Sequence, residues 1–138
     1  MIIGAICTSF KVEVLTGVHI FGTDTIKLAL YSSSASLGPT TTAYTTTGEV
    51  TGTNYSAGGS TLTAIAPTSS GTTAILDFND LTFSNVTLTA RGAMIYNSSK
   101  ANRAIAILDF GSDRVKAAAD FIIRMPVANA TDAVIRID

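Results

Sequence analysis

The sequence contains few of the residues that build reactive or cross-linked sites. Among 138 residues there is no tryptophan, one histidine and one cysteine. A lone Cys7 cannot form an internal disulfide, so nothing indicates an oxidising compartment. A lone His19 excludes a histidine-rich metal site. Without tryptophan, the chain offers no aromatic-rich sugar cleft around a glycosidase pair of carboxylates.

Charge is also scarce. Charged residues make up 14% of the chain, against about 25% in average globular proteins. The net charge of −1 gives no electrostatic reason to expect nucleic acid or an anionic membrane as a partner. No apolar run reaches the roughly 18 to 20 residues that cross a bilayer. The first residues lack the basic and long apolar regions of a signal peptide, so we expect no classical export route.

Sequence motifs of catalysis are missing as well, because the chain has no G-x-S-x-G elbow, P-loop or G-x-G-x-x-G. Cys7 and His19 are the one conceivable reactive pair. Cys7 lies in an apolar run that should raise its pKa, and His19 follows a predicted helix end, where a partly exposed histidine is ordinary. The sequence therefore predicts no catalytic residue, no metal and no cofactor, and hence a protein that is not an enzyme.

Four aspartates leave one alternative open. Asp77, Asp80, Asp109 and Asp113 lie near predicted strand ends, and Asp77 and Asp109 belong to two ILDF segments. If those strands are neighbours, the carboxylates could form an oxygen-rich calcium site. Otherwise these residues cap turns and face the solvent.

The clearest structural signal is a pair of alternating strands. From Val86, apolar and small side chains alternate with polar ones, as in a half-buried strand, until Gly92. Beyond Gly92 the strand is apolar on both faces up to Asn97, so Gly92 suits a bulge or a close backbone approach. A polar turn at 98–102 leads into a second strand at 103–110. We predict that the two form a central antiparallel hairpin.

Shorter segments complete the predicted fold. Phe10, Val14, Leu15 and Val18 have helical spacing after a Thr8-Ser9 cap, with Gly17 as the C′ residue. Further strands are predicted at 25–32, 43–51, 61–66, 72–78, 81–83, 120–126 and 133–137, with a loop or a single helical turn at 111–119. Turn signals every 8 to 12 residues are typical of all-β folds. The fold class is all-β, an antiparallel β-sandwich or barrel of about eight strands with one short N-terminal helix.

The apolar N-terminus divides the chain into an arm at residues 1–7 and one β-sandwich domain at 8–138. Residues 1–6 either add a strand to their own sheet or reach a neighbouring subunit. Arg91 stands alone in a neutral stretch and needs a carboxylate, on its own chain or on a neighbour. The predicted partner contacts are Met1, Ile2, Ile3, Ile6, Arg91 and Tyr96. Arg91, Lys100, Arg103, Arg114 and Lys116 either form a modest basic face or are solvated charges at strand edges.

Several segments resemble small virion proteins of tailed bacteriophages. The resemblance lies in residues 9–19, in DTIKLALYSS at 24–33, in AYTTTGEV at 43–50, in GTNYSAGG at 52–59 and in ARGAMIYN at 90–97. It implies a non-catalytic particle component located in the virion. It marks no catalytic residue.

The first hypothesis is a capsid decoration or cement subunit that contacts the major capsid protein or tail proteins and copies of itself. A tail, collar or fibre-attachment component is the nearest alternative. A carbohydrate-binding module for host attachment is the alternative of another class. It would have to stack sugars on Tyr31, Tyr44, Tyr55 and Tyr96, the four tyrosines of the chain.

Overall fold

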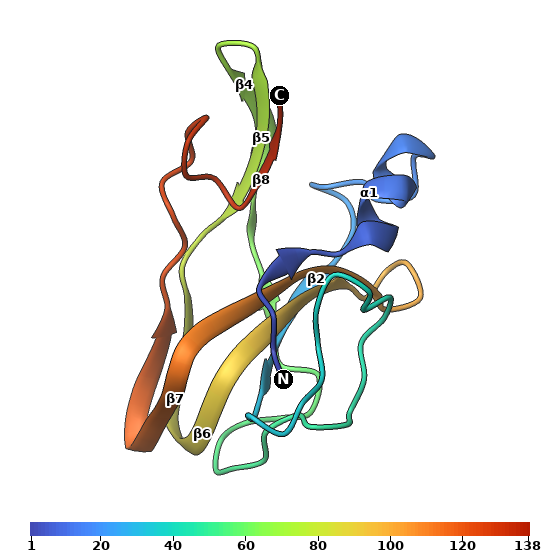
Figure 1. Ribbon diagram of the computed structural model, residues 1–138. Helices are drawn as coiled ribbons and strands as arrows, with labels where there is room; N and C mark the ends of the chain where they lie inside the picture. Colours follow the sequence, from blue (N-terminus) through green and yellow to red (C-terminus); the bar gives the residue numbers. More distant parts are fainter.

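The computed structural model describes residues 1–138 and confirms the all-β class. The strands are β1 (Ala5–Ile6), β2 (Ile26–Tyr31), β3 (Ser60–Leu62), β4 (Ala64–Ser70), β5 (Thr73–Phe78), β6 (Leu81–Asn97), β7 (Arg103–Ile123) and β8 (Ile135–Ile137), and the helix is α1 (Thr8–Leu15). They form a five-stranded sheet in the order β1-β7-β6-β2-β3 and a three-stranded sheet in the order β4-β5-β8. The architecture is an open antiparallel sandwich, not a closed barrel (Figure 1).

The predicted central hairpin is present and is longer than predicted. β6 and β7 pair from Leu81↔Ile123 to Asn97↔Arg103, and both strands bend sharply midway (Figure 1). The segments 81–83 and 120–123 are therefore parts of the hairpin and not separate strands. Residues 111–119 lie within β7, so the predicted loop or helical turn there is wrong. These residues are mostly exposed, and no further strand pairs with β7 there. An exposed edge strand has a composition similar to that of a loop, and the sequence pattern is therefore misleading here.

β2 is confirmed and lies at the centre of the core. Leu28, Ala29, Leu30 and Tyr31 are all fully buried. The segment at 43–51, predicted as a short edge strand, forms only isolated bridges, at Ala43↔Arg103 and at Glu49↔Tyr31. It belongs to a long connection that is held against the sheet by side chains.

The helix is confirmed, but the predicted buried face is only partly correct. Phe10 is buried, whereas Leu15 is 88% exposed. The N-cap is Cys7, and neither Thr8 nor Ser9 caps the helix. Gly17 is the C′ residue with a φ of 73°, and the backbone N–H of Val18 donates to the carbonyl of Glu13, as in a Schellman motif. No helix of the structure is both long and apolar enough to span a bilayer.

The N-terminal segment lies on its own domain. β1 pairs with Ile107 and Ala106 of β7, and Ile2 forms a bridge with Leu37. Ile2 and Cys7 are buried in the main core. Of the two predicted arrangements, the structure has the one in which the segment adds a strand to its own sheet.

Candidate functional site

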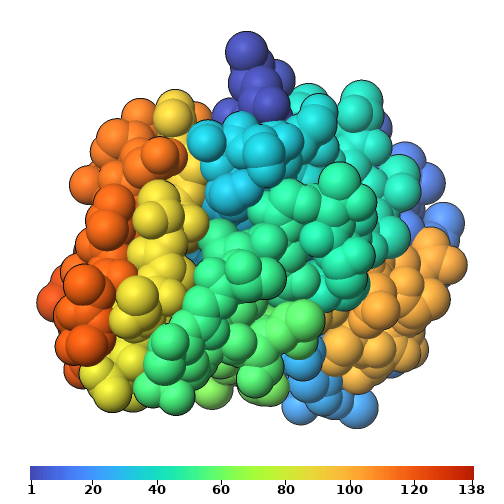
Figure 2. Space-filling model, turned by 90° about the horizontal axis from the view of Figure 1, so that it is seen from below, coloured from blue at the N-terminus to red at the C-terminus, as the bar shows by residue number.

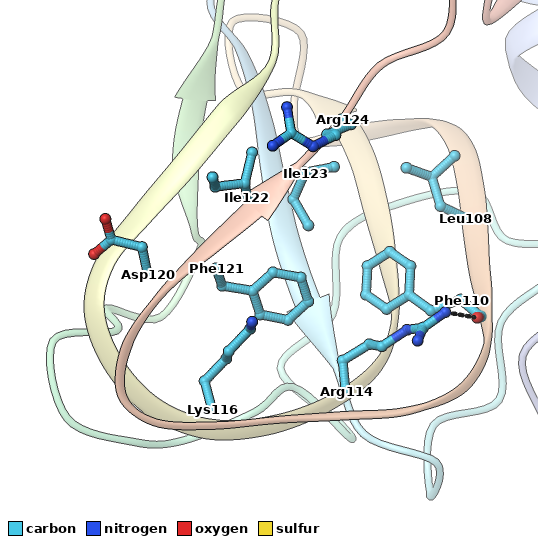
Figure 3. A pocket seen from close by; sticks show the side chains of 9 residues that line it. All are labelled: Leu108, Phe110, Arg114, Lys116, Asp120, Phe121, Ile122, Ile123 and Arg124. Carbon is cyan, nitrogen blue, oxygen red and sulfur yellow. Dashed lines mark hydrogen bonds between the residues drawn. The ribbon is translucent and has the colours of Figure 1, made fainter.

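A cleft lies in the bend of β7, and we call it the β7 cleft. It has a volume of about 550 Å³. Its nine lining residues all come from β7 and the residue that follows it. They are Leu108, Phe110, Arg114, Lys116, Asp120, Phe121, Ile122, Ile123 and Arg124. In Figure 3 the strand runs round the opening, with the Phe110 and Phe121 rings directed inward and the charged side chains at the rim.

The cleft exists because β7 makes a large bulge. Gly92 pairs with Asp109 and Ala90 pairs with Arg114, so residues 110–113 of β7 stand opposite Arg91 alone. Gly111 has a φ of 79°, a conformation in which glycine avoids the strain of a Cβ atom. The extra residues turn the strand, as bulges do. The turn brings the Phe110 ring to within 5.7 Å of the Phe121 ring, centroid to centroid.

Asp109 holds this bulge in place. Its Oδ1 accepts hydrogen bonds from the backbone N–H of Gly111 at 2.8 Å and from Arg91 Nε at 3.4 Å. The Gly111 bond, and then the Arg91 side chain, lower the pKa of Asp109. Arg91 therefore pairs with a carboxylate, as expected from the sequence, and the partner lies on its own chain.

The rim of the cleft is cationic. Arg114 Nη2 donates to the carbonyl of Phe110 at 3.1 Å, and Lys116 Nζ lies 5.8 Å from the centroid of the Phe121 ring. Arg124 Nη1 lies 3.8 Å from a carboxylate oxygen of Asp80, and three quarters (75%) of the Arg124 side chain is exposed. Of the predicted basic residues, only Arg114 and Lys116 come together at this cleft. Arg91, Lys100 and Arg103 each have a carboxylate partner elsewhere.

The outer edge of β7 beside the cleft has no strand partner. β1 covers only Ala106 and Ile107, and no other strand pairs with the outer edge of β7 up to Ile123. Apart from the Gly111 N–H and the Phe110 carbonyl, which bond to side chains within the bulge, outward-pointing backbone groups along this stretch have no strand partner and can accept a further strand.

The residues predicted as partner contacts do not form one surface. Met1 is 81% and Ile3 is 51% exposed, whereas Ile2 is only 7% exposed and packs in the core. Tyr96 is also buried, and its hydroxyl donates to the carbonyl of Gly58 at 2.7 Å. Ile2 and Tyr96 are therefore core residues, because each fills space under the sheet. Ile6 is half-buried beside the core.

The tyrosines form an internal network around Glu49. Tyr44 and Tyr55 donate to the Glu49 carboxylate at 2.5 and 2.8 Å, and the Tyr44 ring stacks on the Tyr96 ring at 4.8 Å. The Tyr31 hydroxyl donates to the carbonyl of Thr45 at 2.6 Å. None of the four rings is fully exposed. These tyrosines hold the 43–59 connection on the sheet and do not offer the stacking platform that the carbohydrate-binding alternative requires.

His19 is more deeply placed than predicted, since its side chain has no exposed surface. Its Nε2 lies 2.9 Å from Glu13 Oε1. The side-chain amide of Asn97 lies 3.0 Å from His19 Nδ1, and its oxygen accepts from the backbone N–H of Ser99. With the amide so oriented, Nδ1 accepts and Nε2–H donates to Glu13. Cys7 takes no part in these hydrogen bonds of His19.

Cys7 is unreactive in this environment. Burial, and then the nearby Glu13 carboxylate, raise the pKa of the Cys7 thiol to about 11. This agrees with the expectation drawn from its apolar neighbours.

The four aspartates do not come together. Asp77 is buried and accepts from the N–H of Phe78, Asp80 accepts from the N–H of Met125, and Asp109 belongs to the bulge. The two ILDF segments lie in different sheets, in β5 and β7. No three Asp, Glu, His or Cys side chains are grouped as metal ligands. The calcium alternative therefore has no assembled ligand set.

Sequence reasoning missed the β7 cleft. The available signal was three cations and two phenylalanines within residues 110–124, but it was divided between a predicted loop and a predicted separate strand. Comparison with protein-family models, curated proteins and solved structures found no match to this chain.

Proposed function

We propose that this chain is a non-catalytic structural protein of a tailed-bacteriophage particle, and that it serves as a decoration or cement subunit of the capsid. The resemblance to small virion proteins over five segments is the first support. The second is the physical character of the chain, which combines few charges with an unpaired sheet edge. A subunit repeated over a shell is stabilised by contacts of this kind with its neighbours.

The single observation that carries the proposal is the open outer edge of β7 between Leu108 and Ile123. A strand from another subunit that pairs there gains backbone hydrogen bonds at an edge that is already ordered. Two exposed apolar side chains, Val115 at 69% and Ile122 at 42%, lie along the same stretch. Burial of such side chains in a contact contributes about 25 cal/mol for each Å² removed from water.

A second exposed apolar feature lies at the N-terminus, whose first residues project from the body of the molecule (Figure 2). Met1 and Ile3 have exposed side chains, whereas the residue between them anchors the segment. We propose these two side chains as additional contacts with neighbouring subunits. The partners are the major capsid protein or tail proteins and further copies of this chain.

Copy number in purified particles tests the proposal and separates it from its nearest alternative. A decoration subunit is present in many copies spread over the shell, whereas a tail, collar or fibre-attachment component forms a ring of about six or twelve. We expect the many-copy result from quantitative mass spectrometry and from imaging of particles. Absence of the chain from purified particles would contradict the proposal.

A matched pair of variants tests the edge itself. Ile122→Glu places a charge on the open stretch of β7, where the native side chain is 42% exposed, and Leu15→Glu places one on α1 at a position that is 88% exposed. Both variants should keep the melting temperature of the unmodified chain. We expect only Ile122→Glu to reduce incorporation into particles. Equal incorporation of both variants would show that the edge is not the contact.

A further inference from the structure

The β7 cleft has the chemistry of a site for an anionic segment with an apolar anchor. Its walls are apolar, from Leu108, Phe110, Phe121 and Ile123, and its rim carries three cations. We propose that the β7 cleft binds an extended acidic segment of a neighbouring protein, with one aromatic or aliphatic side chain inside the cleft and carboxylates at the rim. That the neighbour is a virion protein rests on the proposed function, whereas the chemistry of the cleft does not.

Charge is the strongest argument for this occupant. Neither Arg114 nor Lys116 takes part in any of the five ion pairs of the molecule. The one acidic residue at the rim, Asp120, accepts a hydrogen bond from the backbone N–H of Asn85 at 2.9 Å, and its carboxylate points away from the opening in Figure 3. The rim is therefore positive, with two of its three cations outside any ion pair, although the whole chain carries −1. Such a surface is complementary to carboxylates, which form charge-assisted hydrogen bonds with Arg and Lys.

The apolar interior and the free edge specify the rest of the segment. An aromatic or aliphatic side chain that enters the cleft meets the Phe110 and Phe121 rings. The backbone on either side of that side chain can pair with the outer edge of β7, where alternate residues of an added strand point to the same face. The matching segment therefore alternates acidic and apolar residues.

The N-terminal segment of a second copy fits the cleft less well. Its exposed apolar residues near the N-terminus, Met1 and Ile3, are not accompanied by any carboxylate in the first twelve residues of the sequence. Those side chains offer apolar surface but no negative charge to pair with the cationic rim. A partner protein with an acidic segment satisfies both halves of the site.

Titration of the full ¹⁵N-labelled chain with defined peptides tests the proposal by amide chemical shifts. The probes are three synthetic peptides of about eight residues, in which valine and one central phenylalanine alternate with glutamate, glutamine or lysine. We expect the glutamate peptide to shift amides within residues 108–124 and to bind about tenfold more tightly than the glutamine peptide. The lysine peptide should bind more weakly than the glutamine peptide.

Charge reversal at the rim provides the decisive variant. In the Arg114→Glu/Lys116→Glu double variant, the preference should reverse, so that the lysine peptide binds about tenfold more tightly than the glutamate peptide. Lys11→Glu, an exposed charge reversal on α1, should leave the glutamate affinity within about twofold. No preference among the three peptides, or an unchanged preference in the double variant, would overturn the proposal.

Two other occupants are outcomes of the same experiment. Sodium laurate is the anionic lipid probe, and if laurate shifts these amides while the glutamate peptide does not, a lipid is the occupant and the proposal is wrong. Shifts of the same amides on simple concentration of the chain, without peptide selectivity, would assign the cleft to a second copy and also overturn it. If the chain is found in particles but lacks the peptide preference, the proposed function stands and only the occupant is wrong.

Discussion

Glu13 of the helix and Arg103 at the start of β7 lie 90 residues apart in the chain, and their side chains meet with Nη1 to Oε2 at 2.6 Å. The other oxygen of the same carboxylate lies 2.9 Å from Nε2 of the buried His19. The Phe10 ring packs on the His19 ring at 4.9 Å. One carboxylate thus joins the helix, the connection that follows it and the central hairpin.

Replacement of Glu13 should therefore loosen the helix. In Glu13→Ala, the buried His19 Nε2–H loses its acceptor and Arg103 loses its counterion, so we expect a loss of about 2 kcal/mol in the free energy of unfolding. The loss is limited because the Arg103 side chain is 45% exposed and solvent screens the pair. Urea denaturation measures the loss. Lys11→Ala, on the exposed side of the same helix, is the control and should stay within about 0.5 kcal/mol of the unmodified chain.

The Glu13 carboxylate should also make the folding stability of the chain sensitive to acid. Burial acts to raise the pKa of Glu13, but the hydrogen bonds from His19 and Arg103 outweigh it, and the pKa lies below its ordinary value of 4.5. A carboxyl with a lowered pKa contributes stability that is present above 4.5 and is lost as the pH falls through the folded-state value.

We therefore expect the stability difference between the unmodified chain and Glu13→Gln to shrink as the pH falls from about 6 to about 3. Urea midpoints along this pH series measure it. A constant difference over the whole series would contradict the assignment of the shift to Glu13.

The core of the fold could be predicted from the sequence because it depends on local periodicity. The alternation from Val86 onward predicts β6, and the change of pattern at Gly92 marks a real feature. A Cβ atom at Gly92 would lie 2.5 Å from the carbonyl oxygen of Leu108, and the register shifts between Ala90 and Gly92. Both the close approach and the irregularity were expected from the position of this glycine.

The β7 cleft could not be predicted in the same way. It depends on four residues, 110–113, bulging opposite Arg91, and on which edge of β7 is left unpaired. Neither property is local in sequence. Tyr96 shows the related difficulty for single residues, because a tyrosine suits a contact surface as well as it suits a core with a hydrogen-bond acceptor. Only the position of the Gly58 carbonyl decides between the two.

Asp77 is a position at which we expect a substitution to stabilise the fold. Its side chain is buried, and its Oδ2 has no hydrogen-bond partner. Burial, with a smaller contribution from the charge of Asp80, raises the pKa of Asp77 above its ordinary value of 3.8. The ionised carboxylate is thus unfavourable in the folded state at neutral pH, and the native chain loses stability as the pH rises through the raised value.

Asp77→Asn keeps an oxygen for the N–H of Phe78 and removes the buried charge. We expect the variant to be about 1 kcal/mol more stable at pH 7, and to lose this advantage as the pH falls toward 3.8, where the native carboxyl is protonated. Thermal melts at pH 7 and near pH 3.8 check both the gain in stability and its loss in acid. A variant that is less stable than the native chain at pH 7 would show that the carboxylate has a stabilising partner.

Ile2 and Ile3 separate anchoring from contact within one short segment. Ile2 is 7% exposed, and its side chain lies against Gly92 and the bend of the hairpin, whereas Ile3 is 51% exposed. Ile2→Ala leaves a cavity in the core and should cost about 2 to 3 kcal/mol of stability. Ile3→Ala should cost less than about 0.5 kcal/mol and instead reduce incorporation into particles, because only its side chain is free to touch a neighbour. Urea denaturation and particle composition measure the two effects. Equal losses of stability in both variants would mean that Ile3 also packs within its own domain and makes no contact outside it.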